Sequence, residues 1–168
     1  MTLVEEYAIA QDIFLKLTGI RGESRDASHP DEIDVLAWDW LVTQPSTMRS
    51  GTCDGAEKCR GNDLTIEHYV DRSSPILMLH CLKGKHIDNA VLVMRKAGGT
   101  PLEYLKITMD EVLITRIGST ANLNMAWPRE EVQLSFARMR QEYVIQNARG
   151  GNGGTIATGY DIKAGKAF

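Results

Sequence analysis

Short stretches of alternating apolar and polar residues recur along the chain, and clusters of turn-forming residues separate them. Because successive side chains of a β-strand point to opposite faces, this period of two predicts strands with one face against a core. The predicted strands span residues 12–17, 33–42, 64–70, 90–96, 102–109, 112–117, 131–146 and 155–163. We therefore expect a single mainly β domain, since 168 residues leave no room for two ordinary ones.

Two of these stretches depart from simple alternation. In 33–42 the tryptophans Trp38 and Trp40 share one face and are expected in the core, yet the opposite face is also largely apolar. Such a pattern predicts a strand that is covered on both sides for part of its length. In 131–146 the alternation changes phase near Ala137, where a β-bulge would restore the inward face.

One stretch, 75–83, is predicted to be a helix. Ser74 suits the N-cap, Pro75 the first helical position and Gly84 a left-handed C-terminal stop. Apolar residues cover nearly the whole helical circumference, so the helix must be buried on all sides. A small β domain covers one helix face, so a neighbouring subunit is expected to cover the other. The predicted interface residues are Ile76, Leu77, Met78, Leu79 and Leu82.

Motifs for catalysis are missing from the sequence. It contains no G-x-S-x-G elbow, H-E-x-x-H pair, P-loop or dinucleotide fingerprint. Its four histidines show no ligand-like spacing, and the cluster at 150–154 reads as a turn because no helix follows to bind phosphate. We expect a protein that is not an enzyme and that has no catalytic residue, cofactor or metal.

The charge and the N-terminus restrict the partners and the route of export. A net charge of −3 without a basic run argues against nucleic-acid binding. No apolar stretch approaches the roughly 18 residues of a membrane-spanning helix, so membrane insertion is not expected. The opening MTLVEEYAIA has no basic n-region and is not a secretory signal peptide, which predicts folding in the cytoplasm.

Two of the three cysteines share a long polar segment, 44–63, and long loops of this kind are often functional. Cys53 and Cys59 are expected to be plain thiols, with a disulfide between them or a bound metal as the alternatives. Cys81 lies in the helical stretch and is expected to act as a small buried hydrophobe.

Five segments, read together, resemble one known family. They are DIFLKLTGIRGES (12–24), EIDVLAWDW (32–40), HYVDRSSPILMLHCLKGKHI (68–87), RKAGGTPLEYLKITMDEVLI (95–114) and GYDIKAGK (159–166). In order and spacing they resemble the tube-forming protein of the type VI secretion system, the haemolysin co-regulated protein family. Agreement of five ordered segments is far more specific than any single motif.

The resemblance implies a squashed β-barrel of two sheets with one flanking α-helix, assembled as a hexameric ring. Rings would stack into a tube, and a contractile sheath would propel the tube and its spike out of the bacterium. Small effector proteins would travel inside the ring. The protein would thus be cytoplasmic before firing and then secreted without a cleaved signal peptide. Its implied partners are further copies of itself, the sheath and spike proteins, and effectors.

The resemblance also implies roles for individual residues. Residues 44–63 resemble the family's extended loop, which would reach toward the next ring or subunit, whereas 1–10 extend beyond its usual start. The stacking residues expected in that loop are Met48, Arg49, Cys53 and Cys59. Asp39, between two tryptophans, and Asn122, in the loop 118–128, are expected to face the lumen and cargo. For Asp39, a hydrogen-bonded strand carboxylate is the alternative.

Two other functions stay open from the sequence. A monomeric β-barrel that binds a ligand or catalyses a reaction would need a convergent polar pocket, and no such constellation is evident. An adaptor of the same fold could bind effectors without forming tubes, and ring stacking in vitro would separate it from a tube protein.

Overall fold

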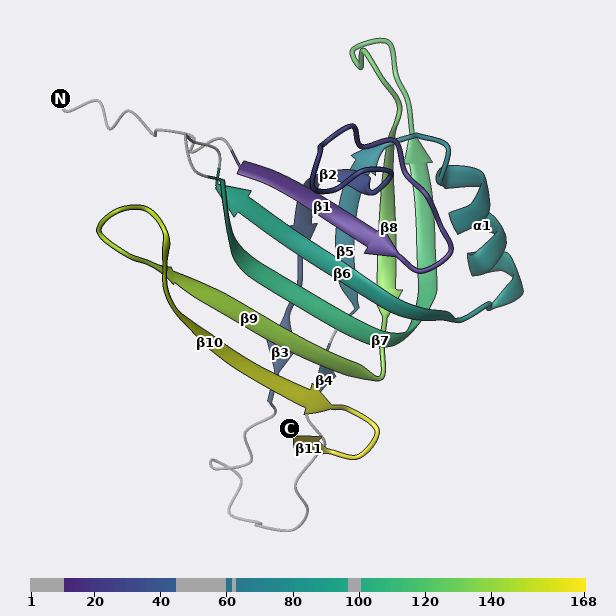
Figure 1. The fold of residues 1–168 in the computed structure, drawn as a ribbon. Helices are drawn as coiled ribbons and strands as arrows, with labels where there is room; N and C mark the ends of the chain where they lie inside the picture. The colour runs from purple at the N-terminus through teal and green to yellow at the C-terminus, as the bar shows by residue number, and fades with distance from the viewer. Residues whose placement is uncertain (1–10, 45–59, 62, 97–100) are drawn as a thin grey trace, which may run out of the picture.

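The computed structural model describes residues 11–44, 60–61, 63–96 and 101–168 (Figure 1). Its elements are β1 (Gln11–Leu17), β2 (Ile33–Asp39), β3 (Val42–Thr43), β4 (Arg60–Gly61), β5 (Leu64–Tyr69), α1 (Ser74–Lys83), β6 (Ile87–Lys96), β7 (Leu102–Thr120), β8 (Arg129–Ser135), β9 (Arg138–Gln146), β10 (Asn152–Asp161) and β11 (Lys166–Ala167). The described part of the chain is mainly β structure with one helix, as the sequence predicts.

Six strands close a barrel in the order β7–β6–β1–β2–β5–β8, because β8 pairs back with β7. All of these pairings are antiparallel. Strands β9 and β10 continue the sheet beyond the barrel on the far side of β7, and we call these two strands the flap (Figure 1). The predicted β-barrel with a flanking helix is therefore confirmed.

One long strand, β7, makes both the closure and the flap possible. Its first part, 105–110, pairs with β9, and its second part, 113–120, pairs with β8. Between them Glu111 has a positive φ of 53°, which bends the strand while the pairing with β6 continues at Val112. The stretches 102–109 and 112–117 were expected as two strands and form one bent strand instead.

The stretch 131–146, predicted as one bulged strand, is two strands. Chain direction changes at Phe136 and Ala137, between β8 and β9, and both side chains are buried. The change of phase in the sequence thus marks a corner, where the chain leaves the closed barrel and enters the flap.

A bulge in β2 explains its two apolar faces. The register with β5 shifts just after Val35. Ile33 and Val35 are buried before the shift, while Trp38 and Trp40 pack against the core after it. Both tryptophans are only partly buried, so their predicted core position is confirmed in part. The expected cover on both faces is wrong, since Leu36 is exposed. The bulge transfers the inward face from one set of residues to the other.

The core is filled by side chains from all six barrel strands and from α1. The largest fully buried residues are Leu15, Ile33, Leu64, Ile66, His68, Leu77, Leu92, Met94, Ile107, Met109, Ile114 and Leu134. All but His68 are aliphatic or methionine, so burial of apolar surface supplies the main stabilising force.

The helix α1 begins one residue earlier than the sequence predicts. Ser73, rather than Ser74, is the N-cap residue, and the Asp71 carboxylate accepts a 2.8 Å hydrogen bond from the Ser73 backbone N–H. Gly84 ends the helix in the left-handed conformation as expected, with φ of 58°.

Candidate assembly surface

An exposed apolar surface lies on the side of α1 that faces away from the barrel. Leu77 is fully buried against the chain's own core, whereas the other predicted interface residues are exposed, up to 76% for Leu82. We call the exposed set the α1 face, and it consists of Ile76, Met78, Leu79 and Leu82. Contiguous exposed apolar side chains of this kind typically mark interaction sites. Leu77 belongs to the core and contributes nothing to this surface.

A charged stack anchors the loop between β1 and β2 to the barrel wall. The Arg95 guanidinium donates hydrogen bonds to Asp26 at 2.5 and 3.0 Å and to Asp12 at 2.8 Å. It lies over the Phe14 ring at 5.0 Å, and that ring also stacks on His29 with centroids 4.3 Å apart. The loop is therefore held by ionic and stacking contacts together.

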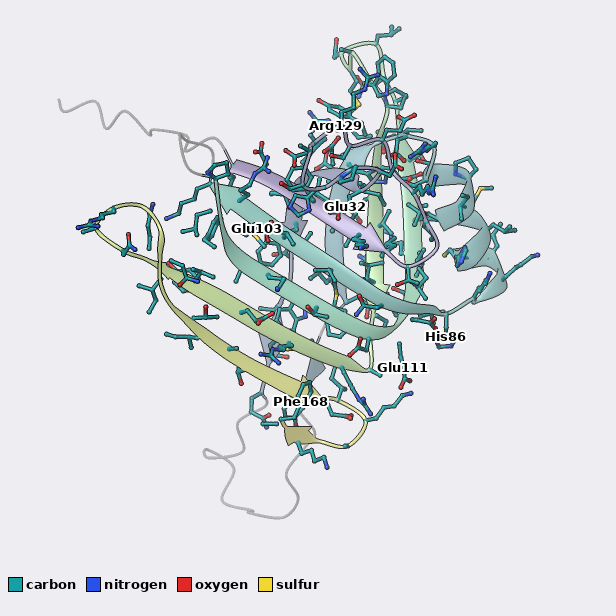
Figure 2. The ribbon with its side chains drawn as sticks, viewed as in Figure 1. Glu32, His86, Glu103, Glu111, Arg129 and Phe168 are labelled. Carbon is teal, nitrogen blue, oxygen red and sulfur yellow. The ribbon has the colours of Figure 1, made fainter. Side chains whose placement is uncertain are left out.

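His29 bridges two carboxylates within this stack. Its Nδ1 lies 2.9 Å from Glu32 and its Nε2 lies 3.0 Å from Glu103, two residues labelled in Figure 2. Both ring nitrogens are therefore within hydrogen-bond distance of a carboxylate oxygen. Because both nitrogens are occupied and the side chain is buried, His29 is placed as an anchor rather than as a catalytic base.

Asp26→Asn is expected to lower the melting temperature at neutral pH. Hydrogen bonds from Arg95 hold the Asp26 pKa at about 2, below its usual 3.8. A carboxyl with a depressed folded-state pKa stabilises the protein above pH 4, and this contribution is lost as the pH falls through 2. Melting curves of both proteins from pH 7 to pH 2 should therefore converge at the acid end. A constant difference across this range would contradict the role of the charge.

A buried pair of polar side chains joins two neighbouring strands of the barrel. His68 on β5 and Glu130 on β8 are cross-strand partners, and the His68 Nε2 lies 3.1 Å from a Glu130 carboxylate oxygen. The Ser119 hydroxyl donates to the other oxygen at 2.8 Å. The serine therefore binds the carboxylate and not the imidazole, which is not the order of a catalytic triad. The His68 Nδ1 is buried with no hydrogen-bond partner.

The structure does not bring the two predicted cargo residues together. Asp39 ends β2 and is exposed, opposite Thr65 on β5. Asn122 is exposed in the loop after β7, at the other end of the strands, where its side chain accepts a 2.9 Å hydrogen bond from the Asn124 N–H.

Other predicted site residues can be placed only in part. The pairing of β3 with β4 closes the base of the predicted loop 44–63. Four residues expected to stack rings lie outside the described residues: Met48, Arg49, Cys53 and Cys59. Cys81 is a free thiol that is only partly buried, less than the sequence predicts.

Among the described residues, His, Cys, Asp and Glu side chains nowhere gather in a group of three or more that could hold a metal ion. Within the same part of the chain, α1 is far too short to cross a bilayer, and no helix is long and apolar enough to do so.

Comparison with known proteins agrees with the fold. Residues 14–143 match the family model described as type VI secretion system effector, Hcp. The chain is 40% identical over 157 residues to Protein hcp1 of Pseudomonas aeruginosa, covering 92% of this chain and 97% of the relative.

Solved structures give the same result. Hcp1 from Salmonella typhimurium is 45% identical with a TM-score of 0.80, over 95% of this chain and 99% of that one. A type VI secretion system effector from Yersinia pestis is 43% identical with a TM-score of 0.74, over 89% and 99%. The chain belongs to the Hcp family of type VI secretion proteins.

Proposed function

We propose that this protein is the structural subunit of a type VI secretion tube, in which rings of six copies stack and carry effector proteins. The observation that carries the proposal is the α1 face. A closed barrel satisfies its own strand edges, yet this fold leaves four large apolar side chains of its helix exposed to solvent. Membership of the Hcp family agrees with a structural role.

A ring requires two different surfaces on each copy. Head-to-tail contacts close into a ring when the rotation between copies allows it, whereas a self-complementary surface stops at a dimer. The α1 face is one such surface, and it lies at one side of the barrel (Figure 1).

The mass of the purified protein tests the proposal. Light scattering and negative-stain imaging at micromolar concentration should give a six-subunit species with an open centre, and longer stacks at higher concentration. A stable monomer across this range would contradict the tube and favour a diverged adaptor.

For cargo, Asp39 and Asn122 stay the proposed contact residues. Because they lie at opposite ends of the β5 and β8 strands, each would contact a different part of an effector. Asp39→Asn is expected to reduce the amount of effector that co-purifies with the ring, without changing the ring mass. Unchanged retention in this variant and in Asn122→Ala would remove both residues from the cargo surface.

A further inference from the structure

Among the described residues, the face of the flap that continues the barrel core is covered only in part. Cross-strand partners lie on the same face of a sheet, and β7 pairs with β9 in an unbroken register from 105 to 110. Met109 and its partner Met139 are both buried. Four residues further along β9, Tyr143 is 45% exposed, and its partner on β10, Ile156, is 64% exposed. The sheet face that packs on the core near Met139 therefore continues outward to Tyr143 and Ile156, where solvent reaches it.

The outer edge of β10 is open as well. In the described part of the chain, β11 pairs with β10 only at Tyr160 and Asp161, which leaves 152–158 without a neighbouring strand on that side. Ile145, on the same face as Tyr143, is also exposed. Exposed apolar side chains beside an open strand edge form a surface on which another chain can dock.

We propose that the flap of one copy receives the α1 face of the next copy in the ring. The helix α1 and the flap lie on opposite sides of the barrel (Figure 1), as head-to-tail association requires. The flap is long enough to cover the helix, since the ten residues of α1 span about 15 Å. The seven residues 152–158 span about 23 Å. This inference rests on the ring proposed above and names the surface that the α1 face contacts.

Pairing of one flap with another flap is the competing arrangement. It would bury the same apolar residues, but it is isologous and ends at a dimer. It would also leave the α1 face exposed in every copy. Contact between α1 and the flap covers both surfaces with one repeated interface, so it accounts for all the exposed apolar side chains of the two elements.

Cysteine cross-linking tests the contact. The background carries Cys53→Ser, Cys59→Ser and Cys81→Ser, and the double variant adds Leu79→Cys with Ile156→Cys. A bis-maleimide or mild oxidation should give a ladder of covalent oligomers on a denaturing gel, ending at the closed ring. Peptide mass mapping should identify the link between positions 79 and 156. Each single variant should stay monomeric on the same gel.

The controls separate this contact from the ring itself. A double variant with Leu123→Cys and Ile156→Cys places the first cysteine on an equally exposed leucine in the loop after β7, and it should give no ladder. Dimers from Ile156→Cys alone would show flap-to-flap pairing and overturn the inference. A ring of unchanged mass without a ladder would overturn the inference but not the proposed function, whereas a monomeric parent protein would overturn both.

Discussion

Leu82→Glu is expected to convert the ring into folded monomers. Leu82 is the most exposed residue of the α1 face, so the single chain loses little packing when it is replaced. In a ring the new carboxylate would be buried against apolar side chains without a partner, and burial of an unpaired charge is strongly unfavourable. Light scattering at fixed concentration should show loss of the six-subunit species. Unfolding of the monomer should change by no more than about 0.5 kcal/mol.

Leu123→Glu is the matched control for this prediction. It makes the same change at a fully exposed leucine of the loop after β7, and the ring mass should not change. Leu77→Ala provides the opposite comparison. Because Leu77 is a core residue, this substitution should lower folding stability by about 2–5 kcal/mol whether or not the ring forms. A ring that survives Leu82→Glu would remove the α1 face from the interface.

The sequence could predict that α1 has two apolar sides but not which side faces outward. Apolar residues cover nearly the whole helical circumference, so the narrow polar edge formed by His80 and Lys83 does not identify the outward side. The outward side depends on how α1 rests on the barrel, which local periodicity does not contain. For the same reason Leu77 could not be separated from its neighbours before the structure placed it in the core.

Strand prediction failed where the chain turns without a turn-forming residue. The bend in β7 falls at Glu111, a residue that seldom adopts a positive φ, and the corner between β8 and β9 falls at Phe136 and Ala137. Tertiary packing imposes both bends, because closure of the barrel requires one strand to pair on two sides. The apolar alternation predicted the strands themselves, since it depends only on local sequence.

The contacts of the buried polar groups could not be predicted from the sequence, because their partners are distant in the chain. His29 meets Glu103, Arg95 meets Asp26, and His68 meets Glu130, each across more than sixty residues. Of these residues, only His68 could be predicted to be buried, since the alternation in 64–70 places it on the same face as Leu64 and Ile66. Nothing local identifies its carboxylate partner.

Glu130→Ala is expected to destabilise the barrel by about 1–3 kcal/mol, the cost of leaving a buried polar group without its hydrogen bond. His68 is fully buried, and Glu130 supplies the one hydrogen bond that its side chain makes in the described structure. Without the carboxylate both imidazole nitrogens would be buried and unsatisfied. Denaturant unfolding of the Leu82→Glu monomer, with and without Glu130→Ala, measures this cost free of ring assembly.

The double variant His68→Leu with Glu130→Leu shows whether the pair serves stability alone. Replacement of both partners by apolar side chains removes the desolvation cost along with the attraction, so the double variant should recover most of the stability lost by Glu130→Ala. Ser119 would still reach solvent from its exposed position on β7. Recovered stability together with an unchanged ring mass would show that positions 68 and 130 need two side chains of the same kind, both polar or both apolar, and not this hydrogen bond in particular. A double variant as unstable as Glu130→Ala would show instead that the barrel needs this hydrogen bond itself.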